Sequence, residues 1–248
     1  MKTYVTQHES YLVQDDVAVM QQSSRACIDE MTRNIRMAGH HLPLGLPPIV
    51  AANTNPDTIT LVYHGNDCET FLTEAMPTTS AELKCNDVSC FEEDQWVYIY
   101  DPDSAVGEWF QISEVQASNH LQHRYNPKDL SRKYPADAII LALNQVKFFV
   151  DDVSDPDNPK LMVKMGGEAP AVYADHIVDL QFRYRLANGT IVDLPVLISD
   201  VREVLVDVTA QSILEGSGGE VVMEQGDRGG EAVRKTRTYS SSVSLRNM

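Results

Sequence analysis

The sequence has no long apolar segment. No window approaches the roughly 18 consecutive apolar residues that a membrane-spanning helix needs. The opening Met1-Lys2-Thr3-Tyr4 also lacks the apolar core of a secretory signal peptide. We therefore expect the chain, as written, to be soluble.

Basic residues are few. The 248 residues include 20 Lys plus Arg against 36 Asp plus Glu, which gives a formal charge of −16. Such a surface repels nucleic-acid phosphates and anionic lipid head groups, so divalent cations or a basic protein are better matched partners. With 43% apolar and 23% charged residues, the composition is that of an ordinary globular protein.

Catalytic and phosphate-binding motifs are absent from the sequence. There is no Gly-x-Ser-x-Gly elbow. The run Gly216-Ser217-Gly218-Gly219 has no following Lys-Ser or Lys-Thr and opens no helix, so it is not a phosphate loop. The sequence nominates no catalytic residue and no cofactor, and we expect a protein that is not an enzyme.

Cysteines are also few, at positions 27, 68, 85 and 90. No CxxC spacing is present, and His64 is the only nearby imidazole, which disfavours a zinc site. Cys85 and Cys90 bracket the turn-forming Asn-Asp-Val-Ser, which favours a disulfide between them in an oxidising compartment. Cys27 and Cys68 could pair or stay free, so three connectivities remain open.

Hydrophobic periodicity predicts a long helix over about residues 7–39. Gly39 stands where a C-cap glycine belongs, and Pro43 follows. Asn34 falls on a polar face of this helix. Three- and four-residue steps place the following side chains on one face: Val13, Val17, Met20, Ser24, Cys27, Ile28, Met31 and Ile35.

After about Ile49 the periodicity changes to that of β-strands. Ile59, Leu61 and Tyr63 alternate with Thr58, Thr60 and Val62, and Ala187-Asn188-Gly189 is a hairpin signal. Further strands are predicted at Trp96–Tyr100, Trp109–Val115, Ala138–Leu143, Gln145–Val150, Leu161–Met165, Ile177–Leu186, Thr190–Pro195, Glu203–Gln211 and Thr236–Leu245.

These elements predict a single α+β domain over residues 1–248. Its helix would pack on one face of an antiparallel β-sheet or sandwich formed by residues 49–248. The glycine-rich, charged composition near 215–233 predicts a mobile loop between the last two strands.

Four blocks of sequence carry a family likeness. They are the helix end 22–39, the strand Ala174-Asp175-His176-Ile177-Val178-Asp179-Leu180-Gln181-Phe182-Arg183-Tyr184, the strand 200–210 and the C-terminal strand 237–247. Together these blocks resemble PilW-type minor pilins of type IV pili, because they come in family order and span nearly the whole chain. J-type pseudopilins of type II secretion systems share much of the pattern.

The resemblance implies a structural subunit that primes a type IV pilus or sits at its tip, or else a pseudopilin. Its partners would be other minor and major pilins, and a tip adhesin. The protein would be a single-pass inner-membrane protein with a periplasmic domain, cleaved and methylated in the prepilin manner, before it joins the filament. Helix residues proposed to face partners are Val13, Val17, Met20, Arg25, Arg33 and Arg36.

One family feature is missing from the sequence. Pilin-like precursors begin with a short basic leader followed by about twenty apolar residues, a length that spans a bilayer. We therefore expect that Met1 is not the natural start and that the membrane half of the helix has been removed.

A calcium- or sugar-binding surface module is the third hypothesis. The acidic loop containing Asp151, Asp152, Asp155 and Asp157 offers the hard oxygen ligands that calcium prefers. It lacks the spacing and glycine of an EF-hand, and its two prolines favour a plain turn.

Aromatic residues in the middle strands suggest either a carbohydrate-binding or adhesive surface or, as the favoured interpretation, sheet core. These residues are Trp96, Tyr98, Tyr100, Trp109 and Phe110.

Overall fold

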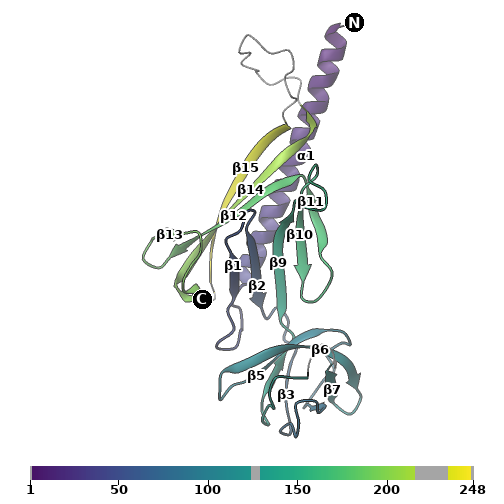
Figure 1. The fold of residues 1–248 in the computed structure, drawn as a ribbon, viewed down its shortest axis with the longest axis vertical. Helices are drawn as coiled ribbons and strands as arrows, with labels where there is room; N and C mark the ends of the chain where they lie inside the picture. The colour runs from purple at the N-terminus through teal and green to yellow at the C-terminus, as the bar shows by residue number, and fades with distance from the viewer. Residues whose placement is uncertain (1, 124–128, 216–233, 247–248) are drawn as a thin grey trace.

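The computed structural model describes residues 2–123, 129–215 and 234–246. Helix α1 runs from Lys2 to Met37, and its N-terminus lies at one extreme of the molecule (Figure 1). Gly39 follows with a φ of 84° and donates its N–H to the carbonyl of Val62 at 3.0 Å. The predicted glycine cap is therefore confirmed, and it also fixes the helix end to a strand. Within the described residues, α1 included, no helical stretch combines the length and the apolar character of a membrane span.

Two antiparallel sheets pack beside α1 (Figure 1). The first has the order β1-β2-β9-β10-β11 and the second the order β13-β12-β14-β15. A short 3-10 helix, Ile198–Asp200, precedes β14. The strands are β1 (Ile49–Ala52), β2 (Thr58–Tyr63), β9 (Asn144–Asp151), β10 (Lys160–Met165), β11 (Ala171–Asp175), β12 (Ile177–Leu186), β13 (Ile191–Val192), β14 (Val201–Glu215) and β15 (Arg234–Ser244).

A third sheet is inserted between β2 and β9, at the end of the molecule opposite the N-terminus of α1 (Figure 1). We call it the inserted sheet, and its order is β3-β8-β5-β6-β7-β4. Its strands are β3 (Glu69–Phe71), β4 (Leu83–Lys84), β5 (Trp96–Asp101), β6 (Val106–Gln116), β7 (His120–His123) and β8 (Ile139–Leu141).

Each part of the fold has its own apolar core. One core lies between α1 and its two sheets, and a second lies within the inserted sheet. A small third cluster that includes Val62, Tyr98 and Leu143 lies where the parts meet. The largest fully buried side chains are Tyr184, Phe148, Phe182, Met31, Ile35, Ile49, Ile59 and Leu61 in the first core, and Tyr134, Leu72, Leu83 and Ile99 in the second.

The predicted α+β class is wrong, because the described chain is mainly antiparallel β-sheet with a single N-terminal α-helix. Fifteen strands accompany the 36-residue helix. The α+β prediction assumed that the helix covers the β-structure as a layer. Instead, α1 contributes one stripe to one core, and the core of the inserted sheet contains no residue of α1.

Candidate functional site

The C-terminal half of α1 buries a regular stripe against the sheets. The spacing of three and four residues keeps these side chains on one face, as the sequence predicts. Ser24 is fully buried and donates its hydroxyl to the carbonyl of Met20 at 2.8 Å, so its polar group is satisfied. The buried residues are Met20, Ser24, Cys27, Met31, Asn34, Ile35 and Ala38.

Asn34 is a buried polar link between α1 and β2 that the sequence analysis missed. Its amide nitrogen donates to the carbonyl oxygen and to Oε1 of Glu30, both at 2.9 Å. Its amide oxygen accepts the hydroxyl proton of Tyr63 at 3.0 Å. Burial raises the pKa of Tyr63, which keeps this hydroxyl a donor. Nothing in the helical period of the sequence identifies such a link, because its partner is distant in the chain.

The residues proposed to face partners fall into two groups. Met20 is buried and Val17 packs against the same core, while the side chain of Val13 lies outside the described residues. Arg25, Arg33 and Arg36 are exposed. A partner would therefore meet the arginines and not the apolar stripe of this half of the helix.

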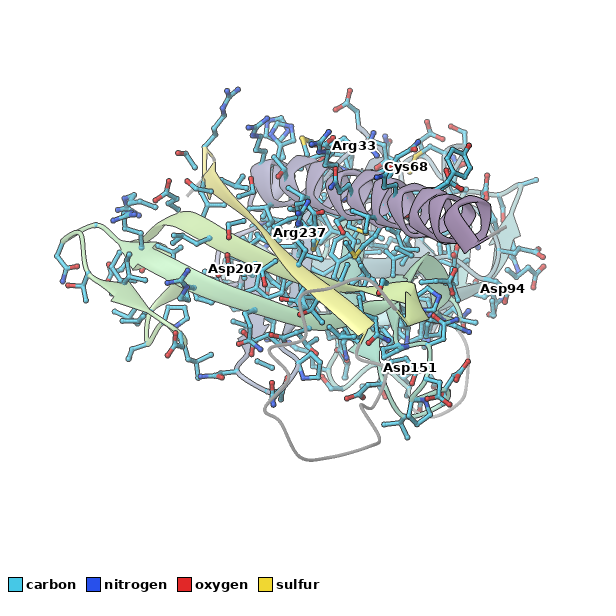
Figure 2. All side chains as sticks on the ribbon, turned by 90° about the horizontal axis from the view of Figure 1, so that it is seen from above. Arg33, Cys68, Asp94, Asp151, Asp207 and Arg237 are labelled. Atoms are coloured by element: carbon cyan, nitrogen blue, oxygen red, sulfur yellow. A yellow bond between two sulfur atoms is a disulfide. The ribbon has the colours of Figure 1, made fainter. Side chains whose placement is uncertain are left out.

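Arg33 forms an ion pair with Glu30, one helical turn away. Its side chain remains 73% exposed, so the pair itself contributes little stability. Figure 2 shows Arg33 on the side of the helix that faces away from β14 and β15.

The outward face of α1 also carries a shallow hollow of about 490 Å³. Ala18 and Ala26 are exposed there, and their short side chains let another chain approach the helix backbone closely. Polar and charged side chains of Gln22, Arg25 and Asp29 surround them.

A larger groove of about 800 Å³ runs between α1 and strands β11, β12 and β14. Tyr173 donates its hydroxyl to the carbonyl of Ala26 at 3.3 Å across this groove. Val19, 49% exposed, lines its helix side.

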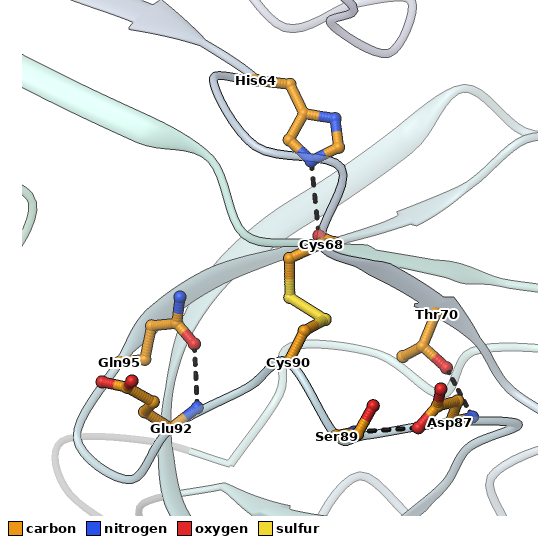
Figure 3. The surroundings of a disulfide bond; sticks show 8 residues. All are labelled: His64, Cys68, Thr70, Asp87, Ser89, Cys90, Glu92 and Gln95. Atoms are coloured by element: carbon orange, nitrogen blue, oxygen red, sulfur yellow. Dashed lines mark hydrogen bonds between the residues drawn. A yellow bond between two sulfur atoms is a disulfide. The ribbon is translucent and has the colours of Figure 1, made fainter.

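The disulfide joins Cys68 to Cys90, so the predicted Cys85–Cys90 pair is not the one formed (Figure 3). Cys85 is a free, buried thiol, and its backbone forms an isolated antiparallel β-bridge with Leu72. Thr70 accepts the N–H of Asp87 at 3.2 Å. This bond brings the following loop over the start of β3, where the Cα atoms of Cys68 and Cys90 are 5.7 Å apart.

The acidic loop after β9 is a hydrogen-bonded turn. Asp151 accepts the N–H groups of Val153 at 3.2 Å and Ser154 at 3.0 Å. The bond from Ser154 is the main cause that lowers the pKa of Asp151. Among the described residues, no three His, Cys, Asp or Glu side chains gather in a way that could hold a metal ion. Calcium binding by Asp151, Asp152, Asp155 and Asp157 stays an untested hypothesis.

The five aromatic residues of the middle strands divide between core and surface. Tyr98, Tyr100 and Phe110 are buried. Trp96 is 37% exposed and Trp109 half-buried, and both line hollows between the inserted sheet and the sheet that contains β9 and β10.

Comparisons with known proteins give similarity only among solved structures. No protein-family model matches the chain, and no curated protein sequence matches it. The solved structure of a type IV-like pilin from Thermus thermophilus aligns at 8% identity and a TM-score of 0.39, covering 95% of this chain and 97% of that one. Because both values are low, the proposed function rests on the geometry of this chain.

Proposed function

We propose that the chain is the periplasm-facing part of a pilin-like structural subunit, a minor pilin of the PilW type. The observation that carries the proposal is the division of α1 into two halves. From Met20 to Ala38 one stripe is buried against the sheets, whereas the N-terminal half continues as helix beyond them (Figure 1).

A projecting helix of this kind favours packing against other chains. The segment from Lys2 to Asp16, which precedes the first core-packed residue Val17, is about 22 Å long at 1.5 Å per residue. A helix of this length is only marginally stable alone in water, so contact with neighbouring helices would stabilise it. Neighbouring minor and major pilins are the partners that we propose.

The position of the inserted sheet supports a place at the filament tip. It lies at the end of the molecule opposite the projecting helix (Figure 1). With the helices directed toward the membrane, this sheet would meet any subunit stacked above it. A subunit at the tip has none above it, and there the sheet is free to face outward or to hold a tip adhesin.

A J-type pseudopilin is the alternative, because the same geometry would serve a secretion pseudopilus with different partners. Either subunit would be anchored in the inner membrane through a segment preceding α1 until it joins the filament. Purification together with pilus subunits or with secretion-system subunits separates the two.

The first test is mass spectrometry of the native N-terminus from source membranes. A methylated Phe followed by an apolar segment supports the proposal. A native Met1 with no apolar segment before it overturns the filament function.

The second test is site-specific photo-crosslinking in cells. A photoreactive residue at Ala18, which lines the outward hollow of α1 and not the groove toward β11, is expected to give adducts with other subunits. The control is Asn188, which is exposed at a turn remote from the helix. Adducts from Asn188 alone would contradict the proposed role of the helix.

A further inference from the structure

A polar groove with tryptophans in its wall lies where the inserted sheet meets the sheet containing β9 and β10. It has a volume of about 640 Å³ and adjoins a second hollow of about 250 Å³. Trp96 and Gln145 line both hollows, and Trp109 lines the smaller one. The two hollows therefore adjoin along a shared wall.

Trp96 is held in place by a glycine in the turn that follows β10. A Cβ atom added to Gly167 would lie 1.8 Å from Nε1 of Trp96, so the indole covers the α-carbon of Gly167 directly. This contact fixes the ring at the wall of the groove while leaving the side chain 37% exposed. Trp109 is fixed by an edge contact with Tyr98 at 5.4 Å between ring centroids.

Amide side chains in the groove are also fixed in advance. Gln95 accepts the backbone N–H of Glu92 at 3.1 Å (Figure 3). Gln111 donates its amide to the backbone carbonyl of Asp94 at 2.9 Å. Side chains that are already ordered lose less conformational entropy when a ligand binds. Amides can donate and accept at once, which suits hydroxyl groups.

The charge of the groove argues against an anionic ligand. Asp94 and Glu168 line the larger hollow, and Lys164 lines the smaller one. In a chain of net charge −16, a phosphate or sulfate group would be repelled there. The ligand that fits is uncharged, rich in hydroxyl groups, and has apolar faces that pack on an indole.

We propose that this groove binds a neutral oligosaccharide. The C–H faces of the sugar rings pack on Trp96 and Trp109, whose indoles combine a large apolar surface with a polar N–H. The hydroxyl groups bond to the amides of Gln95, Gln111 and Gln145 and to the carboxylate of Glu168. This site is independent of the filament function proposed above.

Tryptophan fluorescence tests the proposal directly. The chain contains only two tryptophans, and both line the smaller hollow that adjoins the groove. Titration of the purified chain with maltotriose, cellotriose, mannotriose and chitotriose is expected to give a saturable change in emission with at least one of them. Sialyllactose, an anionic oligosaccharide, is expected to give none.

Variants locate the binding. Trp96→Ala is expected to weaken binding by about tenfold or more, with Trp109 as the remaining reporter. Gly167→Ala displaces the indole and is expected to weaken binding in the same direction. Gln111→Ala removes one amide of the groove and leaves both tryptophans in place. The control is Phe71→Ala, which removes an exposed aromatic residue of the inserted sheet outside the groove and is expected to leave binding unchanged.

Three results would overturn the proposal. It is overturned if no neutral trisaccharide gives a saturable change up to about 10 mM, which is already a weak affinity. It is overturned too if binding survives unchanged in Trp96→Ala and in Gln111→Ala. A response to an extended peptide but to no sugar also overturns it and assigns the groove to a protein partner.

Discussion

The carboxylate of Asp57 accepts the backbone N–H of Phe182 at 2.8 Å, across 125 positions of sequence. Its other oxygen accepts the N–H of Thr54 at 2.9 Å, and its own N–H donates to the carbonyl of Leu180 at 2.8 Å. Asp57 is 3% exposed. One side chain therefore joins the start of β2 to β12 and holds together the two sheets that pack on α1.

We predict that Asp57→Asn lowers the free energy of unfolding by about 1–3 kcal/mol at pH 7. The amide of Asn keeps one acceptor and turns an NH₂ group toward a buried N–H, which loses its partner. Urea denaturation measures the change. The matched control is Asp87→Asn, where an exposed carboxylate accepts the N–H of Ser89 at 2.9 Å and solvent can replace it. Equal losses in the two variants would contradict this role of Asp57.

The stabilities of wild type and of Asp57→Asn should also depend differently on pH. Burial is the main cause that raises the pKa of Asp57 above its usual 3.8. The folded protein therefore binds this proton more tightly than the unfolded chain does. The contribution of Asp57 to stability is complete below 3.8 and is lost as the pH rises through the folded-state pKa. The difference in stability between wild type and Asp57→Asn should thus increase on acidification toward pH 3.8, and a constant difference would refute the shift.

Local patterns predicted several elements correctly. The alternation over 177–186 is confirmed as β12, with the bounds that the sequence indicates. The helix was predicted to end at its glycine cap, and it does. Its start was placed five residues late, because the first residues carry no strong apolar period. These features are determined by residues close together in the sequence, so they can be predicted from the sequence alone.

Long-range pairing was not predictable from these patterns. Strand β2 pairs with β9, more than eighty positions later, and the whole inserted sheet lies between them. For the same reason, the turn between Cys85 and Cys90 favoured the wrong disulfide. The groove at Trp96 is formed by β5, β6 and β9 together with the turn after β10. The aromatic residues could be noted in the sequence, but the contact between Trp96 and Gly167 could not be predicted from it.

We predict that Cys27 and Cys85 are both unreactive in the folded protein. Burial raises the pKa of each thiol to about 12, so almost no thiolate exists at pH 8. Labelling with a coloured disulfide reagent should detect close to zero thiols natively and two after unfolding without reductant. Rapid native labelling of either cysteine would show that its surroundings are more open than the structure indicates.

Removal of the Cys68–Cys90 disulfide should destabilise the protein by about 3 kcal/mol, as for a loop of this size. The double variant Cys68→Ser/Cys90→Ser tests this by thermal denaturation. Reductant provides the internal control, because it should lower the melting temperature of wild type toward that of the variant and leave the variant unchanged. Reductant that destabilises both equally would mean that the bond is not the source of the effect.

Charge reversal on the outward face of α1 tests the proposed assembly function. Arg33→Glu places a carboxylate beside Glu30 on a side chain that is 73% exposed, so folding should change little. If acidic surfaces of neighbouring subunits meet this face, reversal replaces attraction by repulsion, and we expect the number of filaments to fall by about fivefold, which corresponds to about 1 kcal/mol. The matched control is Arg183→Glu on β12, an exposed arginine paired with Asp207 at 2.9 Å on the sheet. Electron microscopy of cells, with melting temperatures of both purified variants, measures the effect. A normal filament number with Arg33→Glu, or an equal loss with Arg183→Glu, would show that the arginines of α1 do not contribute to the interface.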